Sequence, residues 1–191
     1  MFIDTLVIVL GDQNAGKSNQ IRTIFEEYEL GSGLGGYPTS SNIKSRYLVG
    51  RDVELYVRLS SWHEKGQDYT RLKSDLTSHH RCAERRYKAI IPLQISATVP
   101  TDDGQKGLAG GEDLVIKILK DFDVRRSFVV WLNPDVSRRK PFEISPKMAK
   151  FMSKRPSLSV LAIDSLALRP SAAPTTNSIN SRLLADLLFR A

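Results

Sequence analysis

The feature that most constrains the fold is a glycine-containing segment that directly follows a short apolar run. Residues 6–10 (LVIVL) have the length and branching of a buried β-strand. Residues 11–18 (GDQNAGKS) follow without a spacer and fit the pattern G-x-x-x-x-G-K-[ST]. Apolar residues then recur at helical spacing, at Ile21, Ile24, Phe25 and Tyr28. A helix is therefore expected to begin within the motif.

A strand, a glycine loop and a helix in this order provide what phosphate binding needs. Glycines let the backbone approach a triphosphate, and the N–H groups of the loop and of the first helical turn point toward it. Lys17 is expected to reach the β- and γ-phosphates, and Ser18 to offer its hydroxyl to Mg²⁺. A chance glycine turn before a helix is the alternative, and the flanking patterns weigh against it. The motif thus assigns seven residues to phosphate binding: Gly11, Asn14, Ala15, Gly16, Lys17, Ser18 and Asn19.

The length and composition favour one α/β domain spanning residues 1–191. The chain is 41% apolar, which is enough for a sizeable core, and it has no apolar run long enough to span a membrane. The N-terminus lacks the basic start of a signal peptide. Cys82 is the only cysteine, which excludes a disulfide within the chain and fits a cytoplasmic setting.

The net charge of +7 favours anionic partners. Basic residues cluster in three stretches, residues 81–88, 138–140 and 147–155. Nucleic acid is one such partner, although no nucleic-acid-binding motif accompanies the charge. Ordinary solvated helix faces and helix C-termini explain the clusters equally well.

The middle of the chain predicts a β-hairpin. Residues 43–49 and 52–59 both have strand character, and only Gly50 and Arg51 separate them. So short a connection cannot hold a crossover helix, so the two strands must be antiparallel. This excludes a purely parallel, doubly wound sheet.

The remaining elements alternate between helix and strand. Helices are expected over residues 67–86, 114–122 and 179–188, and in the first of them Cys82 or Ala83 is expected to face inward. A further helix is expected to begin with Ser145 as its N-cap and Pro146 at its first position. Strands are expected over residues 89–98, 127–132 and 158–163. Pro92 argues against a fully paired central position for its strand. Residues 168–176 are rich in Pro, Ala, Ser and Thr and are typical of a connector.

This element order resembles that of the Ras-like small GTPases and their translation-factor-related bacterial relatives. The wording of residues 14–18 (NAGKS) is also similar to the N-[AV]-G-K-[ST] of the bacterial members. The resemblance implies a three-layer α/β P-loop NTPase fold, with a mostly parallel sheet and one antiparallel hairpin strand in the Ras-like order. In sequence terms it is strong only at the phosphate-binding loop.

The resemblance also implies roles for residues outside that loop. Either Thr39 or Ser40 is the switch hydroxyl that joins Ser18 on Mg²⁺, and Asn14 lies beside the bridge between the β- and γ-phosphates. Gln67 and His63 are candidates for positioning the attacking water. Asn133 and Asp135 are candidates for reading the base.

Two departures from the family pattern leave the chemistry open. The aspartate of the D-x-x-G motif is absent at Ser60, and Glu64 or Asp68 is a candidate replacement. The base-reading carboxylate position holds Val136, so the choice between GTP and ATP is not decided.

The sequence therefore predicts a purine-nucleoside-triphosphate-binding, GTPase-like switch, or a slow NTP hydrolase, that uses Mg²⁺ and acts through partner proteins. Three alternatives stay open. The first is a catalytically weak, nucleotide-bound scaffold subunit of a larger assembly. The second is a P-loop kinase in which residues 138–140 form a lid, and the third is an ATPase associated with nucleic acid.

Overall fold

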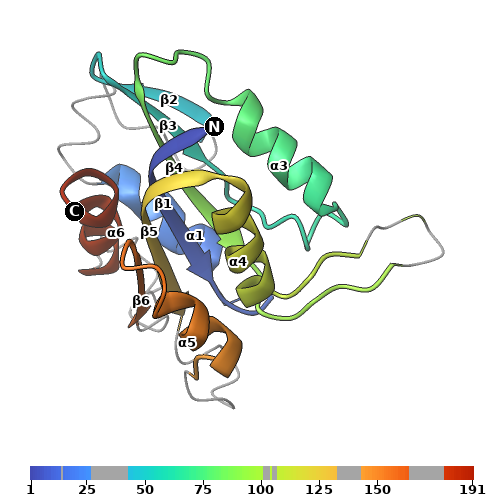
Figure 1. Ribbon diagram of the computed structural model, residues 1–191. Helices are drawn as coiled ribbons and strands as arrows, with labels where there is room; N and C mark the ends of the chain where they lie inside the picture. Colours follow the sequence, from blue (N-terminus) through green and yellow to red (C-terminus); the bar gives the residue numbers. More distant parts are fainter. Residues whose placement is uncertain (14, 27–42, 101–103, 105–106, 133–142, 164–178) are drawn as a thin grey trace, which may run out of the picture.

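A computed structural model describes residues 1–13, 15–26, 43–100, 104, 107–132, 143–163 and 179–191. Within these residues six strands form one sheet, and helices cover both of its faces (Figure 1). The fold is therefore α/β, with a mostly parallel sheet and one antiparallel pair, as the sequence predicts.

The strands follow one another in space in the order β2-β3-β4-β1-β5-β6. Their bounds are β1 Phe2–Leu10, β2 Arg46–Val49, β3 Val53–Val57, β4 Arg86–Leu93, β5 Asp123–Leu132 and β6 Leu158–Ile163. The predicted hairpin is confirmed, because β2 pairs with β3 in antiparallel register from Arg46–Tyr56 to Val49–Val53. All the other strand pairs are parallel.

The helices are α1 Lys17–Thr23, continued by the 3₁₀ turn Ile24–Glu26, then α3 Tyr69–Ser78, α4 Gly111–Asp121, α5 Pro146–Met152 and α6 Ile179–Phe189. The predicted start of α5 is confirmed. Ser145 caps it by accepting a hydrogen bond from the backbone N–H of Met148 at 3.2 Å, and Pro146 is its first residue.

Alternate residues of the central strand β1 enter two cores on opposite faces of the sheet. Ile8 and Leu10 belong to the core that α3, α4 and α5 cover, whereas Val7 and Val9 belong to the core under α1 and α6. All four side chains are fully buried. This double burial explains why the run before the glycine loop is apolar throughout rather than alternating.

The spatial order of the strands departs from the Ras-like order. In Ras-like proteins the strand before the glycine loop pairs directly with the second strand of the hairpin. Here β4 lies between β1 and β3, since β3 pairs with β4 and β4 pairs with β1. The chain order of the elements resembles that family, but the sheet is arranged differently.

The third helix is shorter than predicted, and the expectation that Cys82 or Ala83 faces inward from it is wrong. Asp68 caps α3 at one end, and the helix closes at His79. Cys82 and Ala83 therefore lie in the connection to β4.

Pro92 does not displace β4 from the interior of the sheet. The β3–β4 pairing ends at Ile90, two residues before the proline, whereas the pairing with β1 continues through Val9–Pro92. At Pro92 the edge of β4 that faces β3 is no longer paired, so the missing proline N–H interrupts no hydrogen-bond ladder on that edge.

Candidate functional site

The predicted phosphate-binding residues lie at the carboxyl ends of the parallel strands, where ligands bind in open α/β sheets. The Gly11 N–H donates to Leu93 O of β4 at 3.2 Å, which fixes the start of the loop to the neighbouring strand. Gly16 then takes a positive φ of 86°, a conformation that favours glycine, and α1 begins at the next residue. Gly16 is thus needed for the path of the backbone.

A cavity of about 460 Å³ opens beside this loop. Its lining residues are Gln13, Gly16, Lys17, Ser18, Asn19 and Glu64. Five of the six come from the loop and the start of α1, and the sixth comes from the segment that follows β3. The volume is within the range of small-molecule sites.

Lys17 is the central cation of this cavity. Its Nζ donates to Gly11 O at 3.0 Å and to Asp12 O at 2.6 Å, and it lies 3.6 Å from Glu64 Oε1. Only 3% of the side chain is exposed, and burial lowers the pKa of Lys17, while the charge of Glu64 opposes that shift. A buried ammonium is thus held by two carbonyls of its own loop and one carboxylate.

Ser18 is oriented by the segment that follows β3. Its Oγ donates a hydrogen bond to Leu59 O at 2.7 Å. Because the hydroxyl donates its hydrogen to the protein, its oxygen lone pairs remain for a cation. In the described ranges no three His, Cys, Asp or Glu side chains gather in a metal-binding group. The Ser18 oxygen can serve as a single ligand of a hard cation such as Mg²⁺.

Of the two acids that the sequence offers in place of the missing aspartate, Glu64 is the one that lies beside Lys17. Glu64 lines the cavity, whereas Asp68 is used elsewhere, because its Oδ1 accepts the backbone N–H of Arg71 at 2.9 Å and caps α3. Both acids lie in the segment between β3 and α3. Only the fold distinguishes the acid that faces Lys17 from the acid that caps a helix.

His63 is buried beside the cavity and does not line it. Its Nε2 lies 2.8 Å from Ala109 O, and its Nδ1 lies 3.4 Å from the backbone N of Gln94. The amide N–H must donate to Nδ1, so Nε2 carries the hydrogen and donates to the carbonyl. Burial lowers the pKa of His63 and keeps the ring neutral. Both ring nitrogens therefore tie the segment after β3 to its neighbours.

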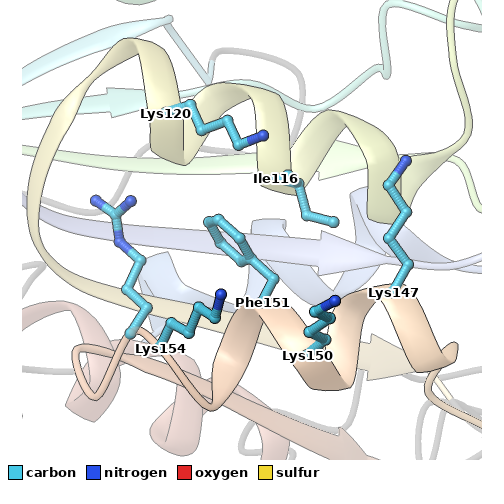
Figure 2. A pocket seen from close by; sticks show the side chains of 7 residues that line it. Ile116, Lys120, Lys147, Lys150, Phe151 and Lys154 are labelled. Atoms are coloured by element: carbon cyan, nitrogen blue, oxygen red, sulfur yellow. The ribbon is translucent and has the colours of Figure 1, made fainter.

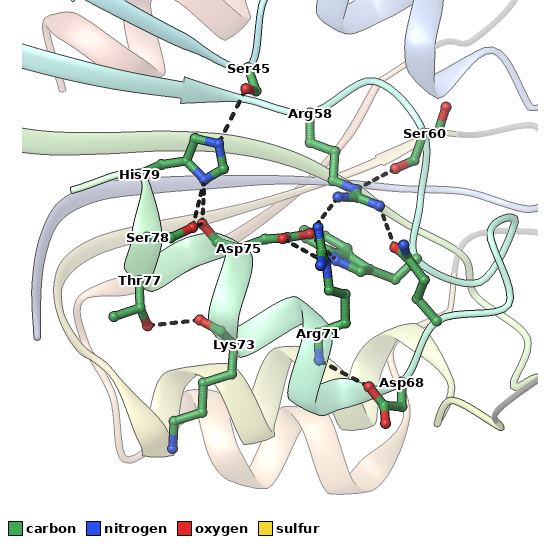
Figure 3. Close-up of polar contacts among 12 residues, drawn as sticks. Ser45, Arg58, Ser60, Asp68, Arg71, Lys73, Asp75, Thr77, Ser78 and His79 are labelled. Atoms are coloured by element: carbon green, nitrogen blue, oxygen red, sulfur yellow. Dashed lines mark hydrogen bonds and ion pairs between the residues drawn. The ribbon is translucent and has the colours of Figure 1, made fainter. Parts of the chain in front are cut away.

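Gln67 is held by an arginine rather than turned toward the loop. Arg58 donates through Nη2 to Gln67 Oε1 at 2.7 Å and through Nη1 to Asp75 Oδ2 at 2.7 Å (Figure 3). The same arginine donates through Nε to Ser60 O at 2.7 Å. These three bonds connect the end of β3, the following loop and α3.

Trp62 anchors the middle of that loop. Its side chain is fully buried, its Nε1 donates to Asp75 Oδ2 at 3.0 Å, and the Arg58 guanidinium lies 4.0 Å from its ring centre. Sequence reasoning missed this network. The available signal was an aspartate on the inward face of an amphipathic helix, since such a carboxylate needs several donors.

Of the remaining predicted site residues, Ala15 is buried at the turn of the loop, where its N–H donates to Asp12 O at 3.2 Å. Asn14, Thr39 or Ser40, and the base-reading pair Asn133 and Asp135 all lie outside the described residues. The structure thus brings Gly16, Lys17, Ser18 and Asn19 together with Glu64. It does not bring Gln67 or His63 into the same cavity.

Searches for related proteins found no matching family model, no matching curated protein and no matching solved structure. Across the described helices, none is long and apolar enough to cross a membrane.

Proposed function

We propose that the protein binds the triphosphate of a nucleotide with Mg²⁺ in the cavity beside Lys17 and hydrolyses it slowly. The observation that carries the proposal is the position of the Lys17 ammonium. It is buried at the base of a loop of the G-x-x-x-x-G-K-[ST] type and faces a cavity lined by that same loop. Among the described residues, Glu64 has the one carboxylate within ion-pair distance of this ammonium, and the charge of Asp12 also favours its charged form.

Phosphate oxygens are better partners for this ammonium than the ones it has. A lysine has three N–H donors, and two of them now point to neutral carbonyls. Charge-assisted bonds to phosphate are roughly twice as strong as bonds between neutral groups. Binding would therefore exchange the carbonyls and Glu64 for phosphate, and the released Glu64 carboxylate would stay at the edge of the site.

Ser18 would hold Mg²⁺ through its oriented hydroxyl. The metal would neutralise charge on the phosphates when bound. The bond from Ser18 to Leu59 O links this metal-binding position to the segment just after β3, which reaches Glu64 five residues later. Phosphate occupancy and the position of Glu64 would thereby be coupled through residues 60–63.

Glu64 is the group that we assign to positioning the attacking water. Hydrolysis requires a metal, a positioned water and stabilised charge at the γ-phosphate. The carboxylate lies beside the lysine that would hold the phosphate. Gln67 and His63 could take this role only by leaving Arg58, Ala109 and Gln94, their present partners.

A switch that acts through protein partners is the accompanying proposal. The anchors at Trp62, His63 and Gln67 imply that the nucleotide would move the Glu64 side chain more than the whole loop. The second candidate function is a nucleotide-bound scaffold without turnover, and the same anchors favour it because they hold the loop after β3 in place. The switch and the scaffold would both bind nucleotide, and only the switch would hydrolyse it.

The test is a nucleotide panel with the full-length protein. Thermal unfolding is followed with GTP, ATP, GDP and ADP, each with Mg²⁺ or with EDTA, and phosphate release is measured in parallel. Mg²⁺-dependent stabilisation by a triphosphate together with phosphate release supports the proposal. Stabilisation without release selects the scaffold, and no stabilisation by any nucleotide refutes nucleotide binding. A preference between GTP and ATP identifies the base.

A further inference from the structure

A strongly basic surface lies on the helical layer formed by α4 and α5. A groove of about 550 Å³ runs between these two helices, and we call it the basic groove. Its apolar floor is formed by Ile116 and Phe151. Its five cations are Lys120, Lys147, Lys150, Lys154 and Arg155. Figure 2 shows Phe151 between the two helices, with lysines from both helices around it.

We propose that the basic groove binds single-stranded nucleic acid, with backbone phosphates on the lysines and a base against Phe151. Such surfaces combine a positively charged groove with an aromatic ring on which a base stacks. This inference does not depend on nucleotide binding beside Lys17, because none of the groove residues lines that cavity.

The charges of the groove are largely available to a ligand. Among the described residues, Lys120, Lys150 and Lys154 have no carboxylate within ion-pair distance, and all three are exposed. The acids near the groove are used otherwise. Asp113 pairs with Lys147 at one end, and Glu112 accepts the backbone N–H of Ser145 at 3.1 Å.

Arg155 supports the aromatic floor. It donates to Leu119 O of α4, and its guanidinium lies 5.9 Å from the ring centre of Phe151. The ring is only partly buried, so part of its surface is open to the groove. A base that stacks there would lie between lysines of both helices.

The chemistry of the groove favours nucleic acid over the other polyanions. An acidic amphipathic peptide needs a row of apolar anchor sites, whereas this floor has one ring and an isoleucine that is 6% exposed. Stable binding to a membrane surface combines basic charge with exposed apolar side chains that insert. The large exposed hydrophobic residues of the described ranges are Met1, Phe2, Leu48 and Val99, and none is on α4 or α5.

The direct test is fluorescence anisotropy with labelled 12-nucleotide dT and U strands. Neutralising three phosphates on a single strand gives a log–log salt slope of roughly −2, so affinity should fall about 20-fold between 50 and 200 mM salt. Lys150→Gln should weaken binding and reduce the magnitude of the slope by about 0.7. Phe151→Leu, which keeps an apolar side chain, should weaken binding at least about fivefold through lost stacking. Comparing the affinities for the dT and U oligonucleotides shows whether the groove prefers DNA or RNA.

The matched control is a charge reversal of the same size away from the groove. Lys150→Glu should reduce binding strongly, while Arg51→Glu at the hairpin turn should not, and Lys17→Ala should bind like the wild type. Equal losses for Lys150→Glu and Arg51→Glu would overturn the proposal, since they would show a general charge effect. Equal affinity for a duplex, or binding only to anionic vesicles or to a polyglutamate peptide, would overturn it as well.

Discussion

Glu64→Gln should tighten nucleotide binding and slow hydrolysis at the same time. The carboxylate lies 3.6 Å from Lys17 Nζ, which corresponds to a bare Coulomb attraction of about 1 kcal/mol at the dielectric constant of water and about 5 kcal/mol at an effective value of 20. The glutamate side chain is 26% exposed, so the lower part of this range applies. A net gain of about 1–2 kcal/mol corresponds to roughly 5- to 30-fold tighter binding.

The hydrolysis step should respond in the opposite direction. A positioned carboxylate contributes about 10²- to 10⁴-fold to proton transfer, so phosphate release should fall at least 100-fold in Glu64→Gln. Calorimetry gives the dissociation constant, and single-turnover phosphate release gives the rate. Glu84→Gln, a change of an exposed carboxylate before β4, is the matched control and should alter neither quantity.

The pH dependence provides a second readout of the same pair. Burial already lowers the pKa of Lys17, and Glu64 opposes that shift. Removing the carboxylate should lower the pKa further, so the loss of nucleotide affinity at alkaline pH should begin at a lower pH in Glu64→Gln. Unchanged affinity, unchanged turnover and an unchanged alkaline limb would refute the role assigned to Glu64.

Two further predictions concern stability. Asp4 and Lys88 form a buried ion pair at 3.2 Å. Burial acts to raise the pKa of Asp4, but the hydrogen bond and charge of Lys88 outweigh it and lower the pKa. The free energy of unfolding should therefore decrease as the pH falls below about 4. Asp4→Asn should lower the free energy of unfolding by about 3 kcal/mol and should flatten its decrease at acid pH, measured by urea titrations at several pH values. An unchanged decrease at acid pH would contradict this. Gly111→Ala should cost about 1–3 kcal/mol, because a Cβ there would lie 2.2 Å from Leu10 Cδ1 and 2.7 Å from Gln94 O; an unchanged urea midpoint would contradict this.

The sequence predicts the fold well where local patterns determine it. The run at residues 6–10 and the two-residue turn at Gly50 and Arg51 identify a buried strand and a hairpin, because period and connection length are local properties. The predicted end of α3 is wrong because the turn at His79 closes the helix, whereas the amphipathic pattern of the sequence continues beyond it. The place of β4 between β1 and β3 depends on long-range pairing that no short segment encodes.

The site shows the same division. The glycine motif predicts the turn at Gly16 and the helix that begins at Lys17, because both are local structures. The choice of Glu64 over Asp68 depends on how the segment after β3 packs. The hydrogen bond from Arg58 to Gln67 forms while the same guanidinium also donates to Asp75. Asp75 belongs to α3, which lies outside the glycine motif. Polar partners across elements are thus the part that sequence patterns leave undetermined.

The most direct test of the central claim is isothermal titration of wild-type protein, Lys17→Ala and Lys65→Ala with Mg²⁺ and each nucleoside triphosphate. Lys65→Ala is the control, because Lys65 is exposed and lies next to Glu64 but outside the cavity lining. This variant and the wild type should bind the nucleoside triphosphate alike. Lys17→Ala should lose at least about 100-fold in affinity, because removing a charge-assisted phosphate contact costs about 3 kcal/mol. Equal binding by the wild type and Lys17→Ala, or binding by neither, would contradict the assignment of this cavity to phosphate.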